Sequence, residues 1–472
     1  MQLLSNNDTR SQQSPRIWHR FLLATGLSIF FILIYGGCTA INEMRGDFGV
    51  IYFEWEQYIP FVPWLIIPYM SIDLFFFGAP FLQSNRDELR ILRQRIMLGI
   101  LIAGVCYILL PLQLVTDRPA VESGMLGYIF RFLHGFDKPY SNLLPSLHII
   151  LRCILVVWYI KRVKRIEGAM GIVLRNILHA WFFLIGCSTV LIGQHHIIDI
   201  IGGFIVAILV FYCVREPKLH IEQTTHVRIA VYYLAGVCIC ALLAFAGFLI
   251  DSILGWLLIG LSTWIGVALL IVVWGYMHAG YRVIAKSDGK IHLSSRLLLA
   301  PWLIGHYISL LYYKPRSKVW DVVDDHVWLG RCLNSSEAEY AVKNGVQAVV
   351  DMTCEFNEAK ALRHCTYINL QTLDLTAPTT STLDQAADCI MSQSKNGCVY
   401  VHCKIGYSRS AAVVAAYFLK AKKAQNVEEA VAMIREKRPN IIIRHEVMDA
   451  LRAYKDALSH PPVRPAITST GY

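Results

Sequence analysis

Residues Val401–Ser410 read VHCKIGYSRS, and this stretch decides the fold of the C-terminal part of the chain. A short apolar run at 398–401 leads into it, as expected for a buried strand. Residues 409–420 are typical of a helix. Cys403 is therefore expected where a strand ends and a helix begins, with the loop 404–408 between them.

This loop has the residues needed to hold a phosphate. Its backbone N–H groups can turn inward, and Gly406 eases that conformation. The N-terminus of the following helix adds positive potential, which also lowers the pKa of a thiol. Arg409 can grip a phosphate through two parallel hydrogen bonds. Cys403 is therefore predicted to be a thiolate that attacks phosphorus and forms a cysteinyl-phosphate.

The surrounding sequence, from about Lys318, predicts a soluble α/β domain with a central sheet flanked by helices. Asn426 and Glu429 have the spacing of an N-cap and its capping-box partner at the start of a further helix. The expected strands are 318–323, 326–329, 347–352 and 398–401, and the expected helices include 335–344 and 409–420.

The C-x5-R-S pattern with its preceding histidine resembles the protein tyrosine and dual-specificity phosphatase superfamily. The resemblance implies that Cys403 is the nucleophile, that Arg409 binds phosphate and that the hydroxyl of Ser410 helps the intermediate break down. The superfamily also uses an aspartic general acid about 30 residues upstream. Asp374 in LQTLDLTAP lies 29 residues before Cys403 on an expected loop, whereas Asp384 and Asp388 fall on a predicted helix.

The resemblance covers about 140 residues, 318–458, and is strongest to the mitochondrial-type phosphatidylglycerophosphate phosphatase branch. It rests on VWLGR, DMTCEFNE, HCKIGYSRSAAVVAAYFLK and VEEAVAMIREKRPNIIIR. Lys404, Gly406 and Ser408 would line the phosphate, and Lys404 suits an anionic phospholipid or an inositol phosphate. Ile405 and Tyr407 depart from the smaller or basic residues of that branch, so a phosphotyrosine substrate stays open.

The 13 cysteines show no metal-type CxxC spacing, and six of them lie in the predicted soluble domain. They are expected to be thiols in a reducing compartment. Cys354 has two interpretations: an ordinary core thiol, or a partner that forms a reversible disulfide with Cys403, as in some relatives. No metal and no cofactor is expected.

The rest of the chain predicts a multi-pass α-helical membrane domain. Of the 472 residues, 55% are hydrophobic and only 17% are charged. A bilayer is crossed by about 20 apolar residues, and about eight stretches qualify. Four are uncharged and four hold polar or ionisable residues: Phe21–Asn42, Ile96–Thr116, Ile229–Ile250 and Ser252–Met277, then 60–82, 142–160, 176–193 and 196–214. The first is too long for a cleaved signal peptide.

The loops between these stretches predict an orientation. Alternate loops hold 3, 4, 5 and 3 lysines and arginines, at Arg10–Arg20, Arg86–Arg95, Lys161–Arg175 and Arg215–Arg228. The loops of the other set hold 1, 3, 0 and 0. The positive-inside rule then places the N-terminus and the C-terminal domain in the cytoplasm. The net charge of +10 needs no nucleic-acid partner, because its basic residues cluster between the spans.

A second constellation lies within the membrane half. PSLH, ending at His148, opens the fourth expected span, and His195 and Asp199 are four residues apart. That spacing places the last two on one helical face. Ionisable groups within a membrane are costly and indicate function. The loop count places His148 and His195 at the same non-cytoplasmic side.

These residues resemble the type 2 phosphatidic acid phosphatase superfamily, and PSLH resembles its inositolphosphorylceramide-synthase-like branch. The resemblance implies that His195 is the nucleophile, that Asp199 orients it and that His148 protonates the leaving group. A backbone N–H near Ser146, and Arg118, would bind phosphate.

The match is incomplete. Thr189 stands where that superfamily has an arginine, and Pro111 stands where it has a lysine. Arg152, one turn after His148, either replaces the missing cation or pairs with Asp199 or Asp73 as a structural contact. His196 is interpreted as a neighbour, not a catalyst.

The expected organisation resembles bacterial fusions of the two phosphatase families, in the inner membrane. The segments are a cytoplasmic tail 1–20, the phosphatase-like membrane domain 21–215 with its six-helix core, two added helices 216–281, a linker 282–317, the cysteine-phosphatase domain 318–460 and a tail 461–472. The linker is either an interfacial segment or a short hydrophobic hairpin.

The expected function is that of a membrane phosphatase with two metal-independent sites, acting on phospholipid or another phosphorylated substrate. The Cys site would cleave a monoester, and the His site would hydrolyse or transfer lipid headgroups. Two rivals stay open. One is a membrane-anchored dual-specificity protein tyrosine phosphatase, and the other has a membrane half that only binds lipid. The sequence makes no prediction of oligomeric state.

Overall fold

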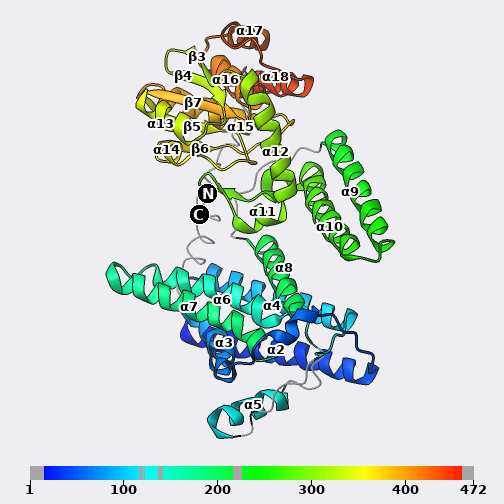
Figure 1. The fold of residues 1–472 in the computed structure, drawn as a ribbon. Coiled ribbons are helices and arrows are strands. Elements are labelled where there is room, and N and C mark those ends of the chain that lie inside the picture. Colours follow the sequence, from blue (N-terminus) through cyan, green and yellow to red (C-terminus); the bar gives the residue numbers. More distant parts are fainter. Residues whose placement is uncertain (1–14, 116–120, 122, 137–141, 216–225, 460–472) are drawn as a thin grey trace, which may run out of the picture. The chain divides into compact units, whose positions relative to one another are not determined.

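The computed structural model describes residues 15–459 except 116–120, 122, 137–141 and 216–225 (Figure 1). The chain divides into two compact units, 1–218 and 219–472. Arg118 falls in the gap 116–120 and so lies outside the described residues. Each unit is described by itself.

The first unit is helical. Its α-helices are α2 (Ile17–Arg45), α3 (Ile66–Gly78), α4 (Arg86–Leu109), α5 (Gly124–Phe136), α6 (Leu147–Val163), α7 (Gly168–Leu191) and α8 (Ile197–Cys213), with 3₁₀ turns η1 (Glu54–Tyr58), η2 (Pro63–Leu65) and η3 (Ala79–Leu82). The amphipathic helix α5 falls in a connection where the sequence predicted none.

The expected fold class is confirmed, since a helix occupies most of each of the eight expected spans, although α4 ends at Leu109 and α6 begins only at Leu147. Within the described chain, six helices are long and apolar enough to cross a membrane: Ile17–Arg45, Pro63–Leu82, Arg86–Leu109, Gly168–Leu191, Val227–Phe248 and Ile253–Val283. The helix α8 is also apolar but shorter. The helix α6 has 17 residues and carries Lys161 and Arg162 in its last turn.

Helix α6 lies at the centre of the first unit, in contact with α3, α4, α7 and α8. Its buried residues include Ile150, Ile154 and Leu155, which pack into a core with Ile96 and Ile100 of α4. Ile150 and Ile154, like Ile96 and Ile100, are four residues apart, so each pair lies on one stripe of its helix. This packing brings the N-terminal ends of α6 and α8 together, where the backbone N–H of Ser146 donates to the carbonyl of Asp199.

The second unit opens with an antiparallel helix pair, α9 (Val227–Phe248) and α10 (Ile253–Trp274). A π-helical turn η4 (Gly275–Ala279) and a 3₁₀ turn η5 (Gly280–Val283) lead to a two-stranded hairpin, β1 (Lys286–Ser287) and β2 (Lys290–Ile291). Next come α11 (Leu293–Leu298), α12 (Ala300–Tyr313) and η6 (Lys314–Arg316).

The remainder is an α/β domain around a five-stranded sheet of order β3-β4-β7-β5-β6. The pair β3–β4 is antiparallel and the other neighbours are parallel. The strands are β3 (Trp320–Asp324), β4 (Val327–Arg331), β5 (Val346–Asp351), β6 (Thr366–Asn369) and β7 (Cys398–Cys403). The helices are α13 (Ser335–Lys343), α14 (Lys360–Arg363), α15 (Thr380–Gln393), α16 (Arg409–Lys420), α17 (Val427–Lys437) and α18 (His445–Ser459).

Helices cover both faces of the sheet. Successive side chains of a strand point to opposite sides, so each strand contributes to both cores. On β7, Val399 and Val401 pack with α15 to α18, whereas Tyr400 packs with α13 and α14. Figure 1 shows α13 and α14 grouped apart from α16 and α18 around the sheet. The strand β7 is the middle strand of the sheet, and it ends at Cys403, where the loop to α16 begins.

The predicted N-cap at Asn426 is confirmed, since its side chain accepts the N–H of Glu429. The carboxylate of Glu429 returns to the N–H of Gln425, one residue before the expected partner.

Candidate active site

Cys403 is the last residue of β7, and α16 begins at Arg409. Gly406 in the intervening loop has φ 79°, in the left-handed region that glycine adopts without strain. A Cβ at this position would clash with the carbonyl of Gly330. Its N–H instead points to the Cys403 sulfur, 3.3 Å away. The loop thus turns donors inward, as predicted.

Arg438 holds the other side of this loop. Its guanidinium donates to the carbonyls of Ile405 and Gly406, each at 3.0 Å, and forms an ion pair of 2.8 Å with Asp321. Because the carbonyls are held outward by Arg438, the N–H groups face the sulfur. The sequence reasoning missed Arg438, although it lies in the REKRPN segment of a family block.

The Cys403 thiol is nearly buried, with 4% of the residue exposed. Ser410 Oγ donates to the sulfur at 3.2 Å. Burial favours the neutral thiol, but the charge of Arg409 and the hydrogen bonds from Ser410 and Gly406 lower the pKa of Cys403 below its ordinary value. The site therefore favours a thiolate nucleophile.

Arg409 is held by Glu355, a residue the sequence analysis did not single out although DMTCEFNE contains it. Arg409 Nη2 lies 2.5 Å from Glu355 Oε1, and Nη1 donates to Oε2 at 3.1 Å. Nη1 also donates to the carbonyl of Thr372 at 2.7 Å. Burial would raise the pKa of Glu355, but Arg409 holds it well below the ordinary value. This fixed guanidinium is pre-oriented for an oxyanion.

Asp374 lies on the loop between β6 and α15, as predicted, and reaches the same place. Its Oδ1 is 3.2 Å from Arg409 Nη2, and its Oδ2 pairs with Lys404. Burial would raise the pKa of Asp374, but these two cations lower it. The carboxylate thus contacts the same cations that a phosphate would require. The hydroxyl of Tyr276 donates to the Asp374 carbonyl at 2.9 Å.

A cavity of about 160 Å³ opens at Cys403. Lys404, Ser408, Arg409 and Asp374 line it, together with Arg444, which sequence reasoning missed. The surrounding residues include three exposed apolar or aromatic side chains: Tyr313, Leu375 and Ile442. A basic floor with an apolar rim can accept a phosphate carried by an amphiphilic molecule.

His402 lies beneath the site, fully buried. Its Nε2 is 2.8 Å from Glu358 Oε2 and 3.7 Å from Asp351 Oδ1. Burial would lower the pKa of His402, but the two carboxylates raise it to about 9. Lys286 of β1 adds a second cation, since its Nζ donates to Asp351 at 2.5 Å. The hairpin β1–β2 is therefore anchored to the sheet.

Cys354 and Cys403 are both free thiols in the structure. The Cys354 sulfur faces Glu355 Oε2 at 3.4 Å and the Thr372 carbonyl at 3.6 Å. Burial, with Glu355 beside it, raises the pKa of Cys354 well above the ordinary value. In this arrangement Cys354 behaves as a core thiol.

The structure also brings together the three membrane residues predicted to act as one site. His195 Nδ1 lies 3.3 Å from Asp199 Oδ2, and the rings of His148 and His195 have centroids 6.5 Å apart. His148 is stacked on Tyr69, with centroids 3.9 Å apart. His195 lies in the turn before α8, not on its face, because the helix begins only at Ile197. The predicted contact forms nonetheless.

The structure gives the contacts of three residues that bear on phosphate binding in this region, Ser146, Arg152 and Thr189. The N–H of Ser146 is already donated to the Asp199 carbonyl at 2.9 Å, so this amide is committed to joining α6 and α8. Arg152 donates Nε–H to the carbonyl of Phe182. No ion pair of Arg152 with Asp199 or Asp73 occurs among the described residues. Thr189 is buried and donates to the Gly186 carbonyl at 2.7 Å.

Sequence reasoning also missed Glu56 of η1. Its Oε2 lies 2.8 Å from His196 Nδ1 and accepts the N–H of Ile197 at 3.2 Å. Both histidines and Glu56 line a cavity of about 150 Å³. His196 is thus a second histidine paired with a carboxylate, beside His195.

Comparison with known proteins finds two family matches. The family described as "Dual specificity phosphatase, catalytic domain" matches residues 327–457, and "PAP2 superfamily" matches residues 69–213. The human protein named phosphatidylglycerophosphatase and protein-tyrosine phosphatase 1 is 33% identical over 168 residues, covering 31% of this chain and 83% of the relative. The rat protein of that name is 31% identical, covering 31% and 86%.

Among solved structures, the crystal structure of PTPMT1 in complex with PI(5)P is 27% identical and covers 30% of this chain and 97% of that chain, with a TM-score of 0.28. The two family matches follow one another along the chain in the order that the histidine and cysteine motifs predicted.

Proposed function

Because the chain belongs to the dual specificity phosphatase family through residues 327–457 and is a phosphoric monoester hydrolase, we propose that its Cys403 site removes the phosphate of a phospholipid monoester. The observation that carries the proposal is the Cys403 sulfur within reach of Ser410, Gly406 and the Arg409 guanidinium, beneath an apolar rim.

In the first step the Cys403 thiolate attacks phosphorus, and the bond from phosphorus to the leaving oxygen breaks. Arg409 and the inward N–H groups stabilise the equatorial oxygens. Asp374, protonated in the complex, gives its proton to the leaving oxygen. The bound phosphate favours this protonation, because it replaces the carboxylate beside Arg409 and Lys404 and adds negative charge next to it.

In the second step a water attacks phosphorus, and the bond from phosphorus to sulfur breaks. The Asp374 carboxylate takes the proton of that water. The Ser410 hydroxyl donates to the departing thiolate, to which it already lies 3.2 Å away. Inorganic phosphate and the free thiolate are the products, so the site is restored without any cofactor.

Three features support a lipid substrate. The rim residues Tyr313, Leu375 and Ile442 are 42%, 48% and 55% exposed, so apolar surface surrounds the basic floor. The helices α11 and α12 expose further apolar residues: Leu293, Leu297, Ile304, Ile308 and Leu311. Such a surface suits the interface of a bilayer. The names of the curated relatives include phosphatidylglycerophosphatase.

The same names include protein-tyrosine phosphatase, which keeps a phosphotyrosine substrate as the second candidate. In that case the membrane half is an anchor or a lipid-binding module. Ile405 and Tyr407 of the loop, which differ from the phosphatidylglycerophosphate branch, favour this alternative.

We further propose that the membrane half holds a second active site. His195 would attack phosphorus, Asp199 would hold its Nδ1–H, and His148 would protonate the leaving headgroup oxygen. PSLH favours the inositolphosphorylceramide-synthase-like branch of that superfamily, in which the phosphate is transferred. Arg118 would supply the phosphate-binding cation that Thr189 and Pro111 do not.

The proposed setting is the inner membrane of a bacterium, with the Cys403 site cytoplasmic and the His195 site on the other side, as the basic loops predict. We retain the predicted domain boundaries but extend the phosphatase domain to include β1–β2. Lys286 and Gly289 of this hairpin hydrogen-bond to Asp351 and to the N–H of Glu358.

The test is phosphate release by the full-length protein in lipid micelles. Phosphatidylglycerophosphate, phosphoinositides, phosphatidic acid and a phosphotyrosine peptide are offered to the wild type, Cys403→Ser and His195→Ala. Lipid activities that are each lost in only one variant support two sites. Loss only in Cys403→Ser, and only for the peptide, supports the anchored tyrosine phosphatase instead.

A further inference from the structure

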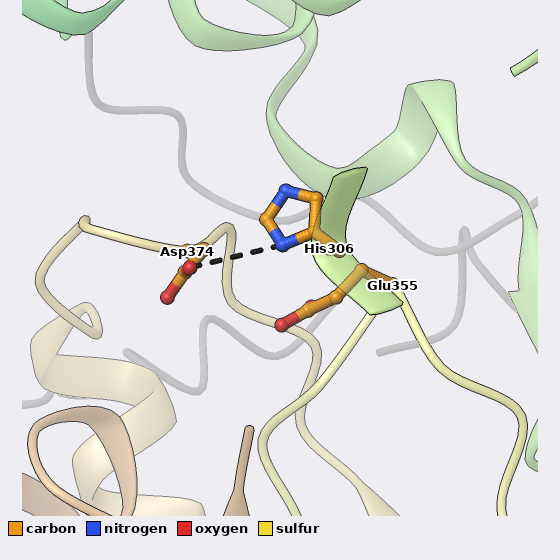
Figure 2. Close-up of side chains that lie close together, drawn as sticks. All are labelled: His306, Glu355 and Asp374. Atoms are coloured by element: carbon orange, nitrogen blue, oxygen red, sulfur yellow. Dashed lines mark ion pairs between the residues drawn. The ribbon is translucent and has the colours of Figure 1, made fainter. Parts of the chain in front are cut away.

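The helix α12 lies outside the matched phosphatase family region, yet it places a histidine at the active site. Figure 2 shows His306 of α12 directed toward Asp374 and Glu355, which come from two loops of the phosphatase domain. His306 Nδ1 lies 3.8 Å from Asp374 Oδ2. The distance is longer than a hydrogen bond, so the two groups are close but not yet bonded.

The imidazole of His306 is fixed and buried. Only 7% of the residue is exposed, and its ring packs edge-on against Trp302 of the same helix, with centroids 4.2 Å apart. Within the described part of the chain, its Nδ1 has no hydrogen-bond partner. A buried nitrogen without a partner lowers the stability of the fold by about 1–3 kcal/mol. We therefore expect this nitrogen to have a function.

The three residues have the ligand types of a metal site, but their other contacts argue against one. Both carboxylate oxygens of Glu355 are bonded to Arg409. The carboxylate of Asp374 is paired with Arg409 and Lys404. A divalent cation placed between them would face two fixed positive charges at close range.

A bound substrate changes the partners of Asp374. Its phosphate dianion needs Arg409 and Lys404, the same two cations that Asp374 contacts. The Asp374 carboxyl must then leave both and hold a proton. The hydroxyl of Tyr276 keeps the backbone of this loop in place, through its 2.9 Å hydrogen bond to the Asp374 carbonyl. Oδ2 lies 3.8 Å from His306 Nδ1, so a shift of less than about 1 Å is enough to bring the two atoms within hydrogen-bond distance.

We propose that His306 is a positioning residue for the general acid: it receives the Asp374 carboxyl that the phosphate displaces and directs its proton at the leaving oxygen. This inference rests on the proposed role of Asp374. Burial lowers the pKa of His306 despite the nearby Glu355 and Asp374, so the ring is neutral and offers one donor and one acceptor nitrogen. The helix α12, which follows the last apolar helices, would thus contribute a residue to the catalytic step.

The test uses leaving groups of different basicity, because a general acid matters most for a basic leaving oxygen. The full-length protein in detergent micelles is assayed with p-nitrophenyl phosphate, whose phenolate leaves readily, and with phosphatidylglycerophosphate, whose alkoxide does not. The expected result for His306→Ala is a loss of kcat of about tenfold on the lipid, with KM unchanged, and less than about twofold on the aryl ester. His306→Asn, which keeps a donor near the position of Nδ1, should restore most of the loss.

Two references make the outcome decisive. Asp374→Asn should show a larger loss with the same dependence on the leaving group, and adding His306→Ala to it should cause no further loss. Tyr307→Ala, the exposed neighbour on α12, should change neither substrate. If Asp374→Asn lacks this dependence, the general-acid role itself is wrong. If Asp374→Asn shows it and His306→Ala slows both substrates equally or neither, the positioning role is overturned.

Discussion

The hydroxyl of Ser410 lies 3.2 Å from the sulfur of Cys403, so the first turn of α16 donates directly to the nucleophile. This contact stabilises a thiolate in the resting site and again when the sulfur leaves phosphorus. It follows from the chain's turn at Gly406, which brings the start of α16 back over the end of β7.

Ser410→Ala is expected to raise the pKa of Cys403. A hydrogen bond to a charged group contributes about 1.5 kcal/mol, which corresponds to about one pKa unit. The pH dependence of alkylation of Cys403 by iodoacetamide measures the change. Ser392→Ala, whose hydroxyl donates to the Cys389 carbonyl at 3.0 Å, is the control and should leave the midpoint in place. An unchanged midpoint in Ser410→Ala would show that the hydroxyl does not stabilise the thiolate.

Glu355→Ala is expected to destabilise the protein and to weaken phosphate binding. The substitution leaves Arg409 buried without its bidentate partner, which costs about 3–5 kcal/mol. Thermal unfolding in detergent micelles and the inhibition constant of inorganic phosphate are the two readouts. Glu339→Ala, at an exposed position of α13, serves as the control. A variant as stable as the wild type would contradict the assigned role of Glu355.

Lys286→Met is expected to lower the melting temperature by about 5–10 °C, because it removes the cation buried against Asp351. The matched control is Lys290→Met in the same hairpin, since Lys290 is exposed and Lys286 is buried. Equal melting temperatures for the two variants would mean that the hairpin is not anchored through Lys286.

The pair of His402 and Glu358 predicts a pH-dependent stability. The folded-state pKa of His402 is about 9, above the ordinary value of 6.5, so the stabilisation is fully present below about pH 6.5 and is lost as the pH rises through 9. The difference in melting temperature between the wild type and His402→Gln should therefore shrink from pH 6.5 to 9. A difference that stays constant over this range would show that His402 is not charged in the folded protein.

The cysteine loop could be predicted because its members are contiguous. Cys403, Gly406, Arg409 and Ser410 lie within one strand-loop-helix unit, where local conformation decides the geometry. Asp374 came from a resemblance that supplied the distance along the chain. The apolar spans could be predicted for a similar reason, since the length and composition of one continuous stretch define each of them.

The residues that support the site could not be predicted in the same way. Tyr276 contacts a residue 98 positions later, and Lys286 one 65 positions later. His306 is likewise distant in sequence from its partner Asp374. No local pattern encodes such pairs, because they depend on how α12 and the hairpin pack on the sheet. The bond between the amide of Ser146 and the carbonyl of Asp199 was not foreseen for the same reason, since Asp199 belongs to another helix.

The most direct test of the central claim is to trap the intermediate. The full-length protein is mixed with radiolabelled phosphatidylglycerophosphate, quenched within one turnover and digested, and the label is sought on the peptide that contains Cys403. Label is expected on that peptide in the wild type and not in Cys403→Ser. Turnover of the lipid with the label absent from that peptide, or undiminished turnover in Cys403→Ser, would contradict it.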